Sequence, residues 1–578
     1  MKKTMFILML AAMMTAVNTA CSTDDSLDSY TNDYYNNQGG TTPGSMGGTT
    51  AGTGELLTFD VAIDKTTAEP TNAATAYYPE DEDAYDGSSF TTEVAIDMSN
   101  PQAKTENGVQ ITVNGGHVTA NHGSVKNVCY VVSGSTSNGS LTILGDKKYA
   151  LQLNSVNITN SDSAAVNLLS KKRAFVVLNG SSSITDGSTS QNDHKGAFYC
   201  KGKLLFNGSG SLDVYGNYNN AIHSADYIMF SHGVNIYAKS TKNHGIKAND
   251  GIFVNGGIIN VEVSAAAAKG INSESDVMVN GGRTTVITTG NGTYDTDDKE
   301  AKGAACIKAD STFIINGGEL YLKSTGSGGK GINADQEGYF NSGNVYIVTT
   351  GGLYSSNGDT SSPKGIKVDS DLYLKGTTIR VRTTGSNGEG IETTGTLTIT
   401  DGDIQISAND DGINSAGDMF IKGGSIIAVG TDNDAIDANG NMYISGGTIV
   451  AMGAGGAETG IDTGEQYRLY ITGGNIFGIG GRIDATLGST SQGIATTTGG
   501  VSANSTVTVS SNGTTLASFT MPPYSYNSGT IMVSTPDMKS GSSYQFGLGS
   551  STVTVTASNT LSSGMGGMGG NMPGGGRW

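Results

Sequence analysis

The sequence predicts an all-β protein, a solenoid built as a single-stranded parallel β-helix. The chain has 578 residues, of which 86 are glycine and only 9 are proline. This composition favours short strands joined by tight turns, because glycine weakens the interior of a helix. A phrase Gly-Ile-x-Ala/Ser also recurs, mostly every 22–25 residues, between about residues 220 and 485. Each phrase precedes two short apolar strands separated by a Gly-Gly step, and such a repeat buries its apolar face only when its copies stack.

The isoleucine of the phrase marks one position in every predicted coil. These residues are Ile222, Ile246, Ile271, Ile307, Ile332, Ile366, Ile391, Ile413, Ile436, Ile461 and Ile483. Two intervals are longer because they contain polar insertions, near residues 293–303 and 352–363. We expect both insertions to form loops on one side of the solenoid.

Each coil is expected to contain three strands. After Ile436, the alternation of side chains across a strand turns Ile436, Met442 and Ile449 toward the inside of the coil. The Gly-Gly step permits a sharp corner between the second and third strands. An asparagine often precedes this corner, and stacked asparagines would form an amide ladder. The asparagines in question are Asn255, Asn280 and Asn316.

The start of the chain has the features of a secretory signal. Lys2 and Lys3 precede an apolar stretch at residues 5–17, and small residues precede Cys21. This arrangement resembles a bacterial lipoprotein signal of the Bacteroidetes type, which implies lipidation at Cys21 and a protein anchored in the outer membrane and exposed on the cell surface. The alternative is an ordinary cleaved signal with a cysteine there by chance.

The composition shifts along the chain and divides it into six parts. These are a lipoprotein signal peptide at 1–20, a disordered polar tether at 21–54, an N-terminal segment or cap at 55–110, the parallel β-helix at 111–494, a small C-terminal β cap at 495–560 and a Gly/Met-rich tail at 561–578.

Charge and cysteine content exclude some classes of function. The formal net charge of −19 argues against nucleic acid as a partner, because phosphate binding needs clustered cations. Beyond Cys21, only Cys129, Cys200 and Cys306 remain, an odd number that cannot form a complete disulfide framework. We expect small buried thiols at these positions.

The segment Tyr77-Tyr78-Pro79-Glu80-Asp81-Glu82-Asp83, the Gly-Ile and Asn-Gly-Gly coils, and the sequence Asp410-Asp411-Gly412-Ile413-Asn414 together carry a family resemblance. Over roughly residues 55 to 540 the chain resembles a carbohydrate-binding parallel β-helix family typified by a protein of a cellulose-degrading clostridium. The resemblance implies a right-handed parallel β-helix akin in shape to pectate lyases, bound calcium, and affinity for cellulose or acidic pectic glycans without demonstrated cleavage.

Acidic residues gather beside the repeat isoleucine in the late coils. Carboxylates stacked on neighbouring coils repel one another unless a cation neutralises them, and Ca²⁺ prefers such oxygen ligands. The alternative is a solvated acidic face. The predicted calcium ligands are Glu389, Glu392, Asp410, Asp411, Asn414, Asp432, Asp434, Asp437, Asp462 and Asp484.

Lysines take the same edge in the earlier coils. They would either bind the carboxylates of a uronic-acid polymer or form ordinary surface pairs with nearby aspartates. These lysines are Lys247, Lys269, Lys308, Lys330, Lys364 and Lys367.

Two outward columns are candidate glycan-binding surfaces, because rings repeating at the coil rise offer an apolar stripe along the solenoid. The alternative is that residues 55–110 or the C-terminal cap cover the stripe. On the second strand, the outward residues proposed to bind glycan are Tyr373, Phe420, Tyr443 and Tyr470, preceded in the same column by Phe253, Met278 and Ile314. On the third strand they are Tyr321, Lys323, Tyr346, Arg380 and Arg382. A further late set with no polar partners is expected to be covered, namely Ile427, Val429, Val450, Met452, Phe477 and Ile479.

The sequence therefore predicts a calcium-stabilised, non-catalytic lipoprotein of the cell surface that binds extracellular polysaccharide, with the membrane reached through the lipid anchor alone. One alternative is a calcium-dependent lyase or hydrolase. Arg482 beside Asp484, or Arg380 and Arg382, would supply the base of a lyase, and the carboxylates of Asp410, Asp411 and Asp434 would supply the groups of a hydrolase. The other alternative is a surface adhesin with a protein partner. Fold alone does not separate these classes.

Overall fold

The computed structural model describes residues 59–189, 194–464, 466–549 and 551–561. The predicted signal peptide, the predicted tether with Cys21 and nearly all of the predicted tail lie outside these residues. The described part is all-β and forms a β-solenoid of about 14 turns, as predicted. It contains no α-helix, only the short 3-10 turns η1 (Asp81–Asp83) and η2 (Gly87–Ser89). No helix among the described residues is long and apolar enough to cross a bilayer.

The repeat phrase supplies one sheet of the solenoid. Its strands are β2 (Lys104–Glu106), β3 (Val109–Asn114), β4 (His117–Asn121), β6 (Ser140–Leu144), β8 (Val166–Leu168), β11 (Gly196–Cys200), β14 (Asn220–Ser224), β17 (Ile246–Ala248), β20 (Lys269–Ser273), β25 (Ala305–Ala309), β28 (Lys330–Ala334), β33 (Lys364–Val368), β35 (Glu389–Thr393), β37 (Ile413–Ser415), β40 (Ile436–Ala438) and β42 (Ile461–Thr463).

The second and third strands of the coils join in one larger sheet. Its strands are β1 (Thr92–Asp97), β5 (Val128–Thr136), β7 (Tyr149–Asn160), β9 (Ala174–Asn179), β10 (Ser181–Asp186), β12 (Leu204–Gly208), β13 (Ser211–Gly216), β15 (Ile228–Phe230), β16 (Asn235–Ser240), β18 (Ile252–Val254), β19 (Ile258–Val263), β21 (Val277–Val279), β22 (Arg283–Thr288), β26 (Phe313–Ile315), β27 (Glu319–Ser324), β29 (Gly338–Phe340), β30 (Asn344–Thr349), β34 (Leu372–Thr383), β36 (Leu397–Ala408), β38 (Met419–Ile421), β39 (Ser425–Gly430), β41 (Met442–Met452), β43 (Leu469–Gly480), β44 (Leu487–Thr490), β45 (Ile494–Val501) and β48 (Tyr526–Ser534).

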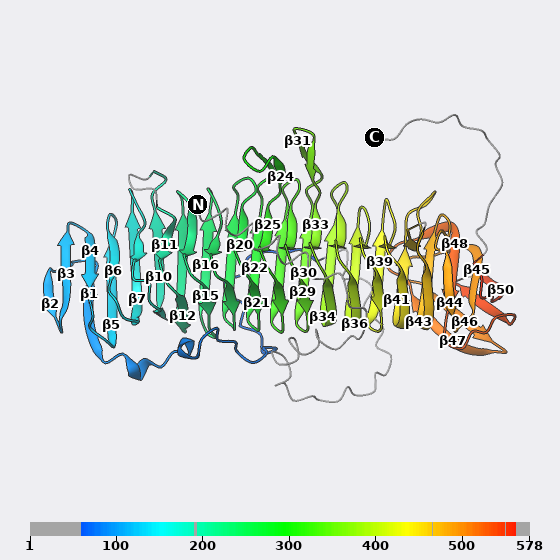
Figure 1. Ribbon diagram of the computed structural model, residues 1–578, viewed down its shortest axis with the longest axis horizontal. Helices are drawn as coiled ribbons and strands as arrows, with labels where there is room; N and C mark the ends of the chain where they lie inside the picture. Colours follow the sequence, from blue (N-terminus) through cyan, green and yellow to red (C-terminus); the bar gives the residue numbers. More distant parts are fainter. Residues whose placement is uncertain (1–58, 190–193, 465, 550, 562–578) are drawn as a thin grey trace, which may run out of the picture. The chain divides into compact units, whose positions relative to one another are not determined.

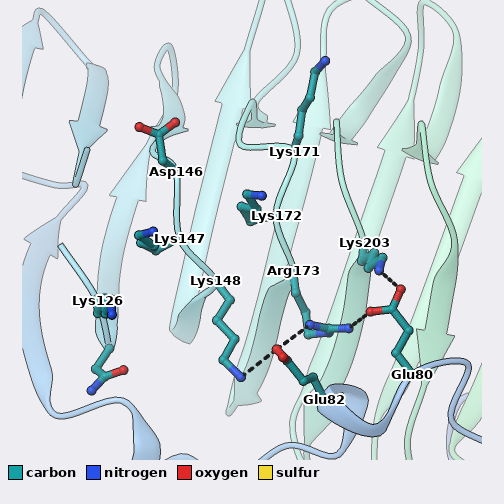
Figure 2. A pocket seen from close by; sticks show the side chains of 11 residues that line it. Glu80, Glu82, Lys126, Asp146, Lys147, Lys148, Lys171, Lys172, Arg173 and Lys203 are labelled. Carbon is teal, nitrogen blue, oxygen red and sulfur yellow. Dashed lines mark hydrogen bonds and ion pairs between the residues drawn. The ribbon is translucent and has the colours of Figure 1, made fainter. Parts of the chain in front are cut away.

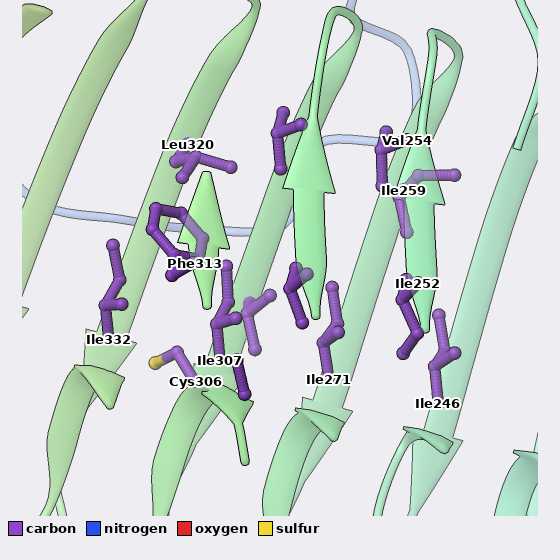
Figure 3. Packing of buried hydrophobic residues seen from close by; sticks show 14 of the residues in the cluster. Ile246, Ile252, Val254, Ile259, Ile271, Cys306, Ile307, Phe313, Leu320 and Ile332 are labelled. Carbon is purple, nitrogen blue, oxygen red and sulfur yellow. The ribbon is translucent and has the colours of Figure 1, made fainter. Parts of the chain in front are cut away.

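The repeat isoleucines stack in one column. Each pairs in register with the isoleucine of the next coil, from Ile222 to Ile461, and all ten are at most 3% exposed. Figure 3 shows Ile246, Ile271, Ile307 and Ile332 in a row along successive coils. The eleventh member, Ile483, lies outside any strand and is only partly buried, so the repeat ends one coil earlier than predicted.

The coils before Ile222 are degenerate in sequence but keep the same register. Leu141 pairs with Val166, Val166 with Phe198, and Phe198 with Ile222, all in parallel. Parallel pairing is present as early as β1 against β5. The register therefore survives without the Gly-Ile phrase, because an apolar side chain of any shape fills the inward position.

The predicted asparagine ladder is present at the corner. The side-chain amide of Asn280 donates to Asn255 Oδ1 at 2.9 Å, that of Asn316 to Asn280 Oδ1 at 2.9 Å, and that of Asn341 to Asn316 Oδ1 at 2.8 Å. Gly257 follows this corner with φ near +85°, which a β-carbon would strain. The ladder satisfies amide groups that the stacked coils remove from water. Its fourth member, Asn341, was not predicted.

Both polar insertions form hairpins, as expected. They are β23 (Thr293–Asp295) with β24 (Glu300–Lys302), and β31 (Tyr354–Ser356) with β32 (Asp359–Ser361). Figure 1 shows β24 and β31 projecting on the same side of the coils. The two hairpins touch, since the backbone N–H of Ala301 donates to Asp359 Oδ2 at 2.7 Å.

The residues before β1 run alongside the early coils (Figure 1) and are fixed to them by hydrogen bonds. Tyr77 and Asn255 exchange two hydrogen bonds of 2.8 Å, and the Ala74 N–H donates to the Asn280 carbonyl at 2.6 Å. Beyond β43 the chain turns back through β48, which pairs antiparallel with β43 and β45. A separate antiparallel sheet follows, made of β46 (Thr506–Ser511), β47 (Thr514–Thr520), β49 (Ser543–Leu548) and β50 (Ser551–Thr556).

The three cysteines within the described residues, Cys129, Cys200 and Cys306, are buried free thiols, as the odd count predicted. Burial raises the pKa of Cys200 and of Cys306 to about 12, so neither is a reactive thiolate at neutral pH.

Candidate functional site

The outward column of the second strand is covered in the early coils. Phe253 is 7% exposed, and its ring packs at 5.2 Å from Tyr77 and 5.8 Å from Tyr227. The N-terminal segment thus provides the cover here. Together with Phe90 of that segment, the buried outward residues are Phe175, Leu205, Met229, Phe253, Met278 and Ile314.

The same column is half-exposed in the late coils. The rings of Tyr339 and Tyr373 stack at 5.0 Å, and Phe420, Tyr443 and Tyr470 stack at 4.8 Å with planes 6° apart. These spacings equal the rise between coils, about 4.8 Å. The ring faces therefore lie against one another, so that edges and phenol hydroxyls, rather than ring faces, point outward.

Cations flank this aromatic column. The ammonium group of Lys375 lies 5.6 Å from the Tyr339 ring and 5.7 Å from the Tyr373 ring, and that of Lys422 lies 5.7 Å from the Phe420 ring. Such contacts are cation–π interactions of modest strength at an exposed site. The column therefore offers edges, hydroxyls and ammonium groups side by side along several coils.

The predicted third-strand residues are brought together but engage the chain itself. Lys323 pairs with Asp60 at 2.8 Å, Arg382 donates to the Phe59 carbonyl at 3.2 Å, and Phe59 packs edge-on against Tyr346 at 5.9 Å. Here too the N-terminal segment lies on the face.

The rest of that set is also occupied by partners within the chain. Tyr321 stacks on Tyr346 at 4.9 Å, with Arg283 over its ring at 4.9 Å. Arg380 is only 8% exposed and pairs with Asp403 at 2.5 Å. The third-strand set is therefore a less open surface than the late second-strand column.

The late apolar residues of the third strand are covered, as predicted. Phe477 packs against Phe519 at 5.8 Å, Ile479 pairs with Ile531 of β48, and the hydroxyls of Ser407 and Tyr524 hydrogen-bond at 2.6 Å. The covering strands come from the C-terminal part. The buried set consists of Ile427, Val429, Val450, Met452, Phe477 and Ile479.

Three of the predicted calcium ligands converge. Single carboxylate oxygens of Asp434, Asp437 and Asp462 all lie within 4.8 Å of one another. Asp437 and Asp462 are neighbours in register on β40 and β42. Asp462 Oδ1 is buried and has no hydrogen-bond partner among the described residues. An all-oxygen set with an unpartnered carboxylate oxygen fits a hard divalent cation.

The carboxyl groups of this column resist ionisation. Burial raises the pKa of Asp411 to about 8, of Asp434 to about 7 and of Asp437 to about 6, and neighbouring carboxylates add to each shift. Burial also raises the pKa of Asp462. At neutral pH these groups are therefore poised to release protons to a cation that binds them.

The other predicted ligands have partners of a different kind. Glu389 and Glu392 both pair with Lys364, whose pKa they raise against the opposing effect of burial. Asp411 accepts from the Asn414 side chain at 3.1 Å and from the Asp434 N–H at 3.1 Å.

Three of the predicted ligands lie apart from the convergent carboxylates. Asp410 accepts from the Asn433 side chain at 2.8 Å. Asp432 is exposed, and Asp484 pairs with Arg482. Of the predicted ligands that the structure describes, Asp434, Asp437 and Asp462 are the three whose carboxylate oxygens converge.

The lysines of the early edge lie on adjacent coils and are engaged within the chain, four of them in ion pairs. Lys247 pairs with Glu274 at 2.8 Å, and Lys308 pairs with Asp310 at 3.1 Å and also with Asp335. Lys364 pairs as described above and Lys367 pairs with Asp369.

The two remaining lysines of this edge form hydrogen bonds to uncharged groups instead; Lys330 is buried and Lys269 is half-buried. Lys269 donates to the Ala267 carbonyl at 2.9 Å, and Lys330 donates to Ser361 Oγ at 2.8 Å and to the Gly328 carbonyl at 3.2 Å. This edge matches the alternative of internal pairs better than that of a uronate-binding row.

A cationic cluster in the first coils was not predicted. It is formed by Lys126, Lys147-Lys148, Lys171-Lys172-Arg173 and Lys203, at the corner that precedes the second strand. The runs of two and three basic residues were visible in the sequence. Their common corner was not, because these coils lack the Gly-Ile phrase by which the register can be recognised in the sequence.

The fold and the sites define a class: a parallel β-solenoid with aromatic and charged columns along its coils. The family described as carbohydrate-binding domain-containing protein matches residues 114–267, 262–351, 325–412 and 359–565. These matches span more than half of the chain, which therefore belongs to this family.

Other comparisons add little. No curated protein matches the chain. A solved structure described as a polysaccharide lyase-like protein from C. thermocellum, in a gadolinium derivative, is 19% identical, with a TM-score of 0.32. The match covers 48% of this chain and 96% of that chain. A score this low does not define a shared fold.

Proposed function

We propose that the protein is a non-catalytic polysaccharide-binding protein that holds an extended glycan, cellulose-like or acidic pectic, along the late second-strand column. The observation that carries this proposal is the contrast within one column. Its early half is sealed by the N-terminal segment, whereas Tyr373, Phe420, Tyr443 and Tyr470 remain half-exposed in ordered stacks. Exposed apolar stripes of this kind mark interaction surfaces.

The chemistry of the column suits a sugar polymer. A glycan lying parallel to the coil axis meets ring edges and phenol hydroxyls on both sides of Thr398, which interrupts the ring column between Tyr373 and Phe420. Lys375 and Lys422 reach its hydroxyl or carboxylate groups. The rings are preorganised by their own stacking, which reduces the entropy that binding must overcome. Family membership supports carbohydrate as the ligand class.

The proposal is tested with a double variant, Tyr443→Ala with Tyr470→Ala. We expect at least a tenfold loss of affinity for insoluble cellulose or soluble glucan, with little change in melting temperature. Tyr467→Ala is the matched control, because Tyr467 is 41% exposed and lies outside the column. Unchanged binding by the double variant would show that the column does not bind the glycan. A large loss of stability would instead mean that the rings are structural.

We also propose calcium at Asp434, Asp437 and Asp462. The convergence of three carboxylates, their raised pKa values and the unpartnered Asp462 oxygen support it. A bound Ca²⁺ would neutralise stacked carboxylates and tie neighbouring coils together. Its role here is stabilisation of the fold.

The proposal that the protein is non-catalytic rests on the side chains that a lyase or hydrolase would need, because these side chains are paired with other groups of the chain. Arg482 pairs with Asp484, and Arg380 is buried against Asp403. Asp411 accepts one hydrogen bond from the Asn414 side chain and one from the Asp434 N–H, so both of its carboxylate oxygens are engaged within the chain. Incubation with polygalacturonate and Ca²⁺, followed by absorbance of the unsaturated product, tests the assignment; steady product release would overturn it.

A further inference from the structure

A cavity of about 500 Å³ opens beside the first coils, far in sequence from the aromatic column. Seven cationic side chains line it and only three acidic ones do, in a chain whose formal net charge is −19. Figure 2 shows the lining side chains at successive corners of the coils. They are Lys126, Lys147, Lys148, Lys171, Lys172, Arg173 and Lys203, with Glu80, Glu82 and Asp146.

One side of the cavity is neutralised by the N-terminal segment. Arg173 pairs with Glu80 at 2.7 Å and with Glu82 at 3.2 Å, and its Nε donates to Asp83 Oδ1 at 2.6 Å. Lys148 pairs with Glu82 at 3.1 Å, and Lys203 pairs with Glu80. The dashed lines in Figure 2 mark the pairs that Lys148, Arg173 and Lys203 form with Glu80 and Glu82. These cations are therefore used in docking the segment.

The other side of the cavity has no such compensation. Lys126, Lys147, Lys171 and Lys172 form no ion pair within the described part of the chain, and three of these side chains are exposed while Lys147 is half-buried. Clustered like charges raise the local potential and attract counter-ions, especially in a concave site. Repulsion among these four lysines therefore costs free energy.

Three of these lysines occupy one position of the repeat. Val128, Tyr149 and Ala174 pair in register on β5, β7 and β9, and each is preceded by a lysine two residues earlier. Lys126, Lys147 and Lys172 therefore form a column with one cation per coil, about 4.8 Å apart.

The corners that carry the lysines are held from coil to coil. The Asp146 N–H donates to the Gly123 carbonyl at 2.8 Å, and the Lys201 N–H donates to the Leu168 carbonyl at 2.8 Å. The backbone that presents the cations is thus fixed before a ligand arrives, which lowers the entropic cost of binding.

We infer that this cavity is a second, calcium-independent carbohydrate site, which binds an oligosaccharide with anionic groups on successive sugars. A charged chain lying along the coil axis would meet one free ammonium group at each coil. Lysine is a compact point charge with three donors, and so accepts either carboxylate or sulfate oxygens in varied orientations. The saccharide class rests on the proposed function, whereas the charge of the ligand and the place of the site rest on the lysine column.

The experiment measures binding by the full mature chain, in the presence of a calcium chelator, to three probes of similar length: an oligogalacturonate, a sulfated glucan oligosaccharide and a neutral cello-oligosaccharide. The variant is the triple substitution Lys126→Gln, Lys147→Gln and Lys172→Gln. We expect at least a tenfold weaker binding of one or both anionic probes, with a weaker dependence on salt. Whichever anionic probe binds more tightly to the wild type identifies carboxylate or sulfate as the preferred group.

A matched control carries Lys195→Gln, Lys242→Gln and Lys539→Gln, three exposed lysines outside the cavity. It has the same change in net charge and should bind as the wild type does. Equal losses in both variants, or no binding of either anionic probe by the wild type, would overturn the inference. The neutral probe separates the two proposals, because its binding depends on the aromatic column and not on these lysines.

Discussion

Arg173 Nε donates to Asp83 Oδ1 across 2.6 Å, although the two residues are 90 positions apart. Asp83 is completely buried and Arg173 is 6% exposed, and the Tyr227 hydroxyl donates to the same carboxylate at 2.7 Å. The acidic segment at residues 77–83 therefore fastens the N-terminal segment to the first coils. Removing one partner of a buried pair leaves the other charge uncompensated, which is more costly than the pair is favourable.

We predict that Asp83→Ala destabilises the docked N-terminal segment by about 3 kcal/mol, because Arg173 and Tyr227 lose a buried partner. Limited proteolysis should then cut between residues 77 and 90 faster than in the wild type. Asp81→Ala is the control, since Asp81 is exposed and forms no ion pair among the described residues. Equal rates of proteolysis in both variants would contradict a role for Asp83 in docking the segment.

The asparagine ladder makes a second prediction. Asn280→Ala should lower the free energy of unfolding by roughly 1–3 kcal/mol, because Asn255 and Asn316 each lose a buried hydrogen-bond partner. The midpoint of denaturant unfolding measures the effect. Asn527→Ala, at an exposed position of β48, should change it little. An unchanged free energy of unfolding in Asn280→Ala would mean that water replaces the missing amide.

The raised pKa values of the acidic column predict how the stability of the protein depends on pH with and without calcium. In chelator, folded carboxyls with pKa values of about 6 to 8 retain protons that the unfolded chain releases near 3.8. The stability of the metal-free protein should therefore fall as pH rises from about 4 to about 8. Calcium should oppose this fall, so that its stabilising effect increases with pH.

Melting temperatures with and without Ca²⁺, at pH values on either side of this window, test that prediction. Asp437→Asn should reduce the calcium-dependent increase, and Asp432→Asn, at an exposed site, should not. A melting temperature that is indifferent to Ca²⁺ at every pH would remove the proposed metal.

Lys330 predicts a separate pH effect with the reverse sign. Burial lowers its pKa from 10.5 to about 7, so the unfolded chain binds a proton that the folded chain lacks between these values. Its contribution to stability therefore rises with pH through that window, by an amount on the order of a few kcal/mol. Lys330→Met should abolish this part of the slope, whereas Lys242→Met at an exposed site should retain it.

The predicted lipid anchor is tested at Cys21. We expect that the wild-type protein incorporates radiolabelled fatty acid and partitions with the outer membrane, and that Cys21→Ser does neither. A single acyl chain binds a membrane only marginally, and stable anchoring takes two signals, such as dual acylation. A Cys21→Ser variant that stays in the membrane fraction would show that another contact holds the protein there.

Much of the fold was predictable because a solenoid repeats its own constraints. The Ile222-to-Ile461 column, the Asn255–Asn280–Asn316 ladder and the two hairpin insertions all follow from positions counted along the chain. Once one coil lies over the next, a one-dimensional period becomes a column in space. The same logic located Asp434, Asp437 and Asp462 near one another.

The period does not determine what covers each column. Phe253 and Tyr443 occupy equivalent outward positions, yet Phe253 is buried under Tyr77 and Tyr443 is half-exposed. That difference depends on where residues 59–90 dock, through contacts such as Arg173–Asp83 that join distant parts of the chain.

The amino-acid sequence alone thus determined the coil, its register and the composition of its columns, since these arise from local alternation and a fixed repeat length. The tertiary structure alone decided which columns are accessible and which cations are already neutralised. Lys172 and Arg173 are adjacent in sequence, but only Arg173 meets the carboxylates of Glu80, Glu82 and Asp83. Access and charge compensation are set by long-range packing, for which a local pattern carries no signal.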